Sequence, residues 1–300
     1  MNANCCQEAS ACAANAACLQ GLECARSEST PDAVQTCTDV RYASGSSAYH
    51  VLDDCVVGSC SDQCAIGADW SCVGSVTVPV ASSATIDGTV TLVELNAQDV
   101  PIAGLDVVAC ESNDSACADP LTPVAVSGAD GSALLVVPTD SSSGHRSFGG
   151  YLQITDPTLT YGTVLAFQIP PTTQTGATST IAVGTTQTAE EAAAAVGITY
   201  DPTKASVVVT AVDCANRTAP DVTFAVIAGD ANPTVYYTLD DIPSRTATAT
   251  DSRGTGFAGN FAPGPISVSI RSNALQRVVA TAQLSARAGG ATQARIAPTP

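Results

Sequence analysis

Residues 75–93 read SVTVPVASSATIDGTVTLV, and the pattern of the chain changes within this stretch. Before it, apolar residues recur at helical spacing, as in Leu52, Val56 and Cys60. From its first residue onward, apolar residues tend to alternate with polar ones, which is typical of β-strands. The stretch therefore divides a helical N-terminal part from a long β part.

The β pattern continues to the C-terminus in short runs separated by Gly, Pro, Asp and Asn, which predicts two antiparallel β-sandwiches. Asp87-Gly88 has turn composition and is expected to precede a strand. The strands expected in the first sandwich are residues 76–78, 89–93, 105–110, 124–126, 134–137, 151–154 and 163–169. Those expected in the second are residues 206–212, 222–227, 235–238, 266–270, 278–284 and 291–296.

A short helix is expected between the two sandwiches. Thr188-x-x-Glu191 has the form of a capping box, four alanines follow it, and Gly197 ends the run. Together with the change at Ser75, this helix sets the expected domains. They are a Cys-rich helical module (1–74), a β-sandwich (75–187), a helix and linker (188–204) and a second β-sandwich (205–300).

Cysteines are concentrated at the N-terminus, where a segment of this size has too few large apolar residues to fold without cross-links. Metal-ligand pairs usually stand two to four residues apart, and Cys60-x3-Cys64 with a single nearby His50 is a poor match. Disulfides are therefore favoured over a metal, with no cofactor expected. The cysteines expected in structural disulfides are Cys5, Cys6, Cys12, Cys18, Cys24, Cys37, Cys55, Cys60, Cys64, Cys72, Cys110 and Cys117.

Within the β part, Cys110 and Cys117 stand close enough in sequence to close a small hairpin loop. Cys214 has no sequence neighbour of this kind. Three states remain open for it: a buried free thiol, a pair with a cysteine of the N-terminal module, or an intermolecular disulfide.

The charge of the chain excludes two classes of partner. There are 28 acidic against 11 basic residues, a net charge of −17, which argues against nucleic acid and against an anionic membrane surface. The sequence contains no run of 18 apolar residues, so no membrane-spanning helix is expected. Disulfides indicate an extracellular, outer-membrane-associated or periplasmic protein. Because the first residues lack a basic and an apolar region, the signal peptide is expected upstream.

Two groups of motifs carry a resemblance to a known family. Near the C-terminus these are TDSRGTGF (250–257), NFAPG (260–264) and ISV (266–268), and in the middle part they are IAGLDV (102–107) and ADG (129–131). The pattern resembles carboxypeptidase-regulatory-like domains, which belong with transthyretin-like and collagen-adhesin B-type sandwiches. The resemblance covers about two thirds of the chain. It implies a mainly β fold with two Ig-like or prealbumin-like sandwiches and a scaffold rather than a catalyst.

The Cys-x5-Cys-x5-Cys spacing of Cys12, Cys18 and Cys24 lies in an Ala-rich run. This head resembles those of secreted proteins predicted in myxobacteria, which again implies a bacterial, exported protein.

No catalytic constellation is expected, and the chain is interpreted as a non-enzyme. Ser147 stands near His145, but without the nucleophile elbow and following helix that a hydrolase needs. The C-terminus, Ala297-Pro298-Thr299-Pro300, lacks the tetrapeptide of transthyretin-like hydrolases. An adhesin-type isopeptide bond would need an Asn on the last strand opposite Lys204, and residues 291–296 contain none.

Calcium is a minor alternative. It takes six to eight oxygen ligands, and Asn113-Asp114, Asp130 and Asp240-Asp241 are candidates, yet none has a calcium-loop pattern. Solvated turns are the favoured interpretation of these acids.

The leading hypothesis is an exported structural or adhesion protein that contacts an unknown protein or polysaccharide at the cell surface. The alternatives are a carbohydrate-binding protein and an accessory subunit of a neighbouring enzyme. Sugar binding usually needs exposed aromatic rings, and Tyr236-Tyr237 on one strand would point to opposite faces. The candidate rings are Tyr42, Tyr49, Trp70, Tyr151, Tyr161, Tyr200, Tyr236 and Tyr237.

Overall fold

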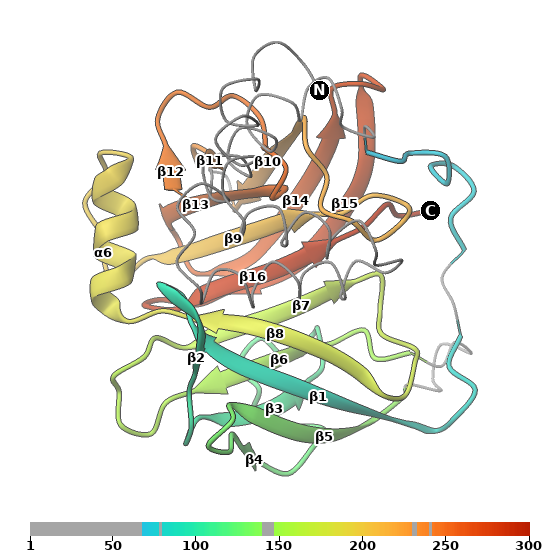
Figure 1. The fold of residues 1–300 in the computed structure, drawn as a ribbon, viewed down its shortest axis with the longest axis vertical. Helices are drawn as coiled ribbons and strands as arrows, with labels where there is room; N and C mark the ends of the chain where they lie inside the picture. The colour runs from blue at the N-terminus through green and yellow to red at the C-terminus, as the bar shows by residue number, and fades with distance from the viewer. Residues whose placement is uncertain (1–67, 78–79, 140–146, 230–232, 240–241) are drawn as a thin grey trace, which may run out of the picture. The chain divides into compact units, whose positions relative to one another are not determined.

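The alternating segments form the expected mainly β structure (Figure 1). The computed structural model describes residues 68–77, 80–139, 147–229, 233–239 and 242–300, which belong to the compact unit Ala68–Pro300. The expected helices of the N-terminal module lie outside the described residues.

The first half of this unit contains eight strands. They are β1 (Thr85–Glu94), β2 (Ala97–Pro101), β3 (Asp106–Cys110), β4 (Ala125–Val126), β5 (Ser132–Pro138), β6 (Tyr151–Thr155), β7 (Val164–Ile169) and β8 (Ala177–Val183). After helix α6 (Thr186–Ala195) come β9 (Ala205–Ala211), β10 (Val222–Ala228), β11 (Tyr236–Leu239), β12 (Ile242–Ser244), β13 (Thr255–Phe261), β14 (Gly264–Ser272), β15 (Arg277–Ala286) and β16 (Ala291–Ile296).

Three sheets are built from these strands. One has the order β2-β1-β5, with β8 added to β1 in parallel, and a second has the order β10-β14-β15. The third is nine-stranded, in the order β12-β11-β13-β9-β16-β7-β6-β3-β4. Its central strand, β16, pairs in parallel with both β9 and β7. The C-terminal strand thus joins the first and second halves in one continuous sheet.

Two hydrophobic cores lie on opposite faces of the nine-stranded sheet. On β7, Val164 belongs to the core beneath β1 and β5, whereas Leu165 and Phe167 belong to the core beneath β10, β14 and β15. On β3, Val107 and Val108 divide in the same way. Because successive side chains of a strand point to opposite faces, a strand covered on both sides is apolar without interruption.

Two local predictions were wrong. Asp87-Gly88 is not a turn but lies inside β1, where both residues pair with β5, because the ladder to β5 starts at Thr85. The helix starts earlier than Thr188. Its N-cap is Thr185, whose hydroxyl accepts the Thr188 N–H at 3.2 Å. Thr185, three residues before Thr188, thus accepts an N–H of the first turn that has no partner within the helix.

The predicted end of the helix is confirmed, and the motif at residues 250–257 contains a turn. Gly197 follows the C-cap in the left-handed region, with a φ of 77°. Arg245 donates from Nε to the carbonyl of Ala195 at 3.1 Å and so places a cation at the helix C-terminus. Gly254 turns the chain before β13 with a φ of 67°, and a Cβ there would lie 2.6 Å from the Ala211 carbonyl oxygen.

Candidate functional site: the anchor of the N-terminal segment

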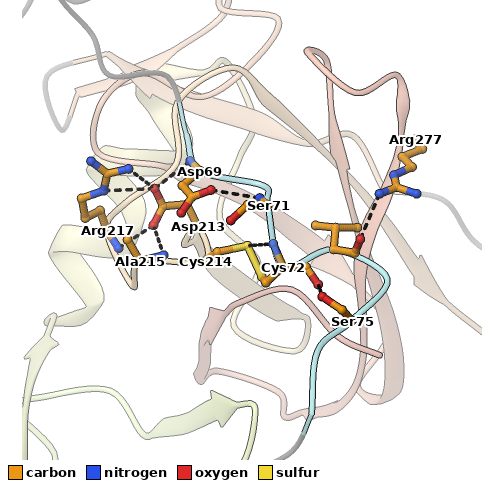
Figure 2. Close-up of a disulfide and its surroundings, with 10 residues drawn as sticks. Asp69, Ser71, Cys72, Ser75, Asp213, Cys214, Ala215, Arg217 and Arg277 are labelled. Atoms are coloured by element: carbon orange, nitrogen blue, oxygen red, sulfur yellow. Dashed lines mark hydrogen bonds and ion pairs between the residues drawn. A yellow bond between two sulfur atoms is a disulfide. The ribbon is translucent and has the colours of Figure 1, made fainter.

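A disulfide ties the start of the described chain to the second half of the unit. Cys72 is bonded to Cys214 across a sequence separation of 142 residues (Figure 2). Cys214 lies in the loop after β9, and Cys72 lies in the turn that precedes β1. We call residues 68–75 the anchor segment, because residues 1–67 are covalently connected to the β unit through it.

Asp213, next to Cys214, is a buried carboxylate that organises this attachment. It is 2% exposed. Its Oδ2 accepts the main-chain N–H of Asp69 at 2.9 Å, and its Oδ1 accepts those of Ala215 and Arg217 at 2.9 Å. The Arg217 guanidinium donates two bonds to Oδ2, from Nε at 3.1 Å and Nη2 at 2.7 Å. These five bonds are drawn in Figure 2, and they satisfy both oxygens.

The electrostatics of Asp213 follow from these contacts. Burial raises the pKa of its carboxyl, but the Asp69 amide, the Arg217 side chain and the Arg217 amide together lower it more, so its net pKa lies below the ordinary value. Asp213 is therefore ionised at neutral pH, and its charge is paired with Arg217 in the one ion pair found among the described residues.

The anchor segment makes further bonds on both sides of the disulfide. The Cys214 N–H donates to the Asp69 carbonyl at 2.8 Å, and the Cys72 N–H donates to Cys214 Sγ at 3.1 Å. Arg277, at the start of β15, donates from Nη2 to the Val73 carbonyl at 3.2 Å. Trp70 and Val73 pack against the core beneath β10, β14 and β15. The segment is thus held by covalent, polar and apolar contacts together.

The second described disulfide joins Cys110 to Cys117, the pairing expected from their spacing. Its loop is tied to the sheet by Tyr151, whose hydroxyl donates to the Asp114 carbonyl at 2.6 Å. Arg287 donates to the Ser115 carbonyl at 2.8 Å, to the Tyr151 hydroxyl at 2.9 Å and to the Gln153 side chain. Burial, the largest effect, raises the pKa of Tyr151, which stays a neutral donor.

For Cys214, the structure selects the pair with the N-terminal region. Cys72, one of the cysteines expected in a structural disulfide, is thus the partner of Cys214. The reason is geometric, since the anchor segment runs beside the loop after β9 and brings the two Cα atoms to 5.7 Å. The other nine cysteines of the N-terminal module lie outside the described residues, and their disulfides stay predictions.

The carboxylates of the described calcium candidates accept hydrogen bonds from nearby groups in their own turns. Asp114 accepts the N–H groups of Ala116 and Asp119, which lowers the pKa of its carboxyl. Asp130 accepts the hydroxyl and the N–H of Ser132, with the same effect on its pKa. Asp240 and Asp241 lie outside the described residues. Within the described ranges, no three His, Cys, Asp or Glu side chains are grouped so as to hold a metal ion.

The remaining sequence candidates are His145 with Ser147 and the aromatic residues. His145 lies outside the described residues, so its relation to Ser147 stays a prediction. Tyr237 is buried, and its hydroxyl accepts the Phe224 N–H at 3.0 Å. Tyr236 lies against Phe257, with ring centroids 5.6 Å apart. Every aromatic side chain in the described part of the chain is buried or half-buried.

Tyr161 lines a polar pocket beside the N-terminus of α6. Its hydroxyl donates to Glu94 Oε1 at 2.8 Å, which is the largest of the effects that raise the pKa of this phenol. The pocket has a volume of about 200 Å³, enough for one small polar molecule. Its lining consists of Glu94, Leu95, Asn96, Tyr161, Val183, Thr185, Gln187, Thr188 and Glu191.

Sequence reasoning missed Asp213, Arg217 and Asp69 as parts of one site. Asp213 had a weak signal, since it precedes the one cysteine without a nearby partner. Asp69 had none, because the contact depends on a chain reversal that no local pattern encodes.

The fold and the anchor define a mainly β protein with disulfide-linked segments. No family model matches the chain, and no curated protein matches it by sequence. Among the described residues, no helix has the length and apolarity needed to cross a membrane.

Several solved structures are similar to this chain. The Bacillus anthracis TIE protein is 9% identical, with a TM-score of 0.25, over 71% of this chain and 34% of that one. The shaft pilin SpaA from Lactobacillus rhamnosus GG is 13% identical, with a TM-score of 0.23, over 72% of this chain and 98% of that one. BcpA, the major pilin subunit of Bacillus cereus, is 7% identical, with a TM-score of 0.23, over 72% and 99%. At these scores the similarity carries no inference about activity or partners.

Proposed function

We propose that the chain is a non-enzymatic, exported structural or adhesion protein that acts outside the cytoplasm, at the cell surface or in the periplasm. The observation that carries the proposal is the Cys72–Cys214 disulfide, which joins segments 142 residues apart and is accompanied by the shorter Cys110–Cys117 bond. Disulfides of this kind persist in oxidising compartments.

The anchor also supports a scaffold function. The anchor segment, which leads to residues 1–67, is fixed by the Asp213 carboxylate, the disulfide and the contact with Arg277. If the chain is cut between Cys72 and Cys214, the disulfide still holds residues 1–67 to the β unit. Such cross-linking suits a protein that carries load or displays a module.

The oxidation state is tested by alkylating the native protein without reduction and mapping its peptides by mass spectrometry. We expect Cys72 linked to Cys214 and Cys110 linked to Cys117, with none of the four alkylated. The same sample reduced first is the control and should alkylate at all four. Fractionation of the source cells should find the oxidised protein outside the cytoplasm. Free thiols at these positions, or a cytoplasmic location, would contradict the proposal.

Glycan binding is a second candidate, favoured by the pocket at Tyr161. Two carboxylates, two amides and three hydroxyls line it, which is the hydrogen-bonding chemistry that sugars need. Titration with neutral monosaccharides, followed through the amide signals of Asn96 and Gln187, tests this candidate. Glu94→Gln should weaken binding. Glu190→Gln, on helix α6 beside the pocket but not in its lining, should not. Equal binding by both variants, or none by the wild type, would reject a sugar site here.

A further inference from the structure

The edge strand β5 has main-chain groups available for another strand. It pairs with β1 along one side and ends the order β2-β1-β5, and Figure 1 draws it as the green strand below β1. Two bonds set the alternation of this ladder. The Thr139 N–H donates to the Ala84 carbonyl and the Leu92 N–H donates to the Gly131 carbonyl, both at 2.9 Å. By alternation, the main-chain N–H and carbonyl groups of Ala133, Leu135 and Val137 bond to β1. Those of residues 132, 134 and 136 point away from β1.

Of the outward residues, two lack partners within the described part of the chain. The Ser132 N–H is taken by Asp130 Oδ1 at 3.0 Å and its carbonyl by the Gly128 N–H at 2.9 Å. The N–H and carbonyl groups of Leu134 and Val136 have no such bonds. An antiparallel strand laid along this edge would gain four main-chain hydrogen bonds.

The side chains at the same two residues are apolar and exposed. Leu134 is 65% and Val136 is 52% exposed, whereas the alternate residues Ala133, Leu135 and Val137 are buried. Proteins usually protect such an edge with charge, proline or a covering segment. Here no charged residue occurs from Gly131 to Thr139, and the one proline, Pro138, is the last residue of β5, beyond Leu134 and Val136.

Two other long edges of the unit, those of β10 and β15, are partly covered by groups of the chain itself. On β10, the Tyr237 hydroxyl accepts the Phe224 N–H and the Thr250 hydroxyl accepts the Val222 N–H at 3.1 Å. On β15, the Thr299 N–H donates to the Val279 carbonyl and the Thr299 hydroxyl accepts the Thr281 N–H. The chain thus covers part of these two edges with its own groups, whereas no described group bonds to the outward main-chain atoms of Leu134 and Val136.

Charge around the edge indicates the chemistry of the occupant. Asp87 lies on β1 directly opposite Val136 and is exposed on the same face. Asp130 is exposed at the start of β5. Residues 75–200 contain twelve acids and one base. A second copy of this chain would bring negative charge to an edge that is already acidic. A partner segment with lysine or arginine could instead extend such a side chain past Val136 to reach Asp87.

We propose that the free edge of β5, at Leu134 and Val136, binds an extended, basic segment of a partner protein by antiparallel strand addition. The apolar residues of that segment contact Leu134 and Val136, and its basic residues face Asp87 and Asp130. This inference goes beyond the proposed scaffold function and does not require it, since the edge has the same geometry in any compartment.

The test uses the full chain and a seven-residue peptide of alternating lysine and valine. Titration followed by backbone amide NMR should shift the signals of Leu134 and Val136, and added salt should weaken the binding. A peptide of alternating glutamate and valine is the charge control and should not bind. Equal binding of both peptides, no binding, or shifts confined to other strands would overturn the proposal.

Variants of Val136 distinguish the contribution of its main-chain N–H to binding from that of its side chain. Val136→Pro removes one outward N–H without breaking the β1 ladder, and we expect binding to fall about tenfold or more. Val136→Thr keeps the N–H and should bind nearly as the wild type does. Leu134→Lys places a like charge at the edge and should also abolish binding, which covers the case in which the proline variant does not fold. Unchanged binding by folded Val136→Pro would refute strand addition. A dimer of the wild type that Val136→Pro abolishes in sedimentation equilibrium would replace the proposed partner with a second copy.

Discussion

The carboxylate of Asp213 accepts the main-chain N–H of Asp69 at 2.9 Å, although 144 residues separate them in the chain. The same carboxylate binds Arg217 and lies beside the Cys72–Cys214 disulfide. A buried charge is costly unless it is fully paired, and here both oxygens are satisfied. The anchor is therefore held by this carboxylate in addition to the covalent bond.

Replacement of Asp213 should destabilise the β unit. Asp213→Ala leaves the amides of Asp69, Ala215 and Arg217 without their acceptor, and we expect a loss of about 3 kcal/mol in the free energy of unfolding. Urea unfolding measures this. Asp201→Ala is the matched control, because Asp201 caps the N–H and hydroxyl of Thr203 in an exposed turn. It should cost about 0.5 kcal/mol. Equal losses would mean that burial of Asp213 is not what matters.

Loss of the two disulfides should have unequal effects. The chain-entropy relation gives about 5 kcal/mol for the long loop closed by Cys72–Cys214 and about 2.5 kcal/mol for the short one closed by Cys110–Cys117. The double variant Cys72→Ala/Cys214→Ala should therefore unfold at lower urea than Cys110→Ala/Cys117→Ala, both measured without reductant. The reverse order would show that native contacts of the short loop outweigh the entropy of the long one.

Acid should weaken the anchor. The pKa of the Asp213 carboxyl is lowered on folding, so its contribution is fully present above the unfolded value of about 3.9 and is lost as the pH falls through the folded value. The urea midpoint of the wild type should thus drop between about pH 5 and pH 2. Asp213→Asn lacks this carboxyl and should show a shallower drop. Parallel curves for the two proteins would assign the acid sensitivity to other carboxyls.

The hydroxyl of Tyr237 should stabilise the edge of β10. Tyr237→Phe removes the acceptor of the Phe224 N–H and should cost about 1 kcal/mol. Amide hydrogen exchange at Phe224 should become faster than in the wild type. The control is Tyr236→Phe, which keeps the ring beside Phe257, and it should change neither quantity. Unchanged exchange at Phe224 in the Tyr237 variant would show that another group protects this amide.

Local pattern predicted most strands and the fold class. The alternation of residues 206–212 and 278–284 corresponds to β9 and β15, because the period of two reflects one buried face. Strands β2, β8, β12 and β13 were missed. In β8, the first residues are exposed threonines and serine, so no apolar alternation marks the strand. Its structure comes from the parallel ladder with β1.

The candidate site was predicted only in part. The spacing of Cys110 and Cys117 was enough to expect their bond, since a short loop brings the two residues together. The partner of Cys214 stayed open among three states, and the position of Asp213 next to Cys214 was its only signal. Both depend on the anchor segment lying beside the loop after β9, a contact across more than a hundred residues.

The mainly β class, the helix between the two halves and the Cys110–Cys117 disulfide could be predicted from the sequence alone. These follow from the period of apolar residues, from capping threonines and from the spacing of cysteines, which are properties of neighbouring residues. The tertiary structure was needed to show that β16 joins the halves, that Cys72 pairs with Cys214 and that β5 is the last strand in the order β2-β1-β5. These depend on which distant segments share a buried face, and alternation specifies the face of a strand but not its neighbour.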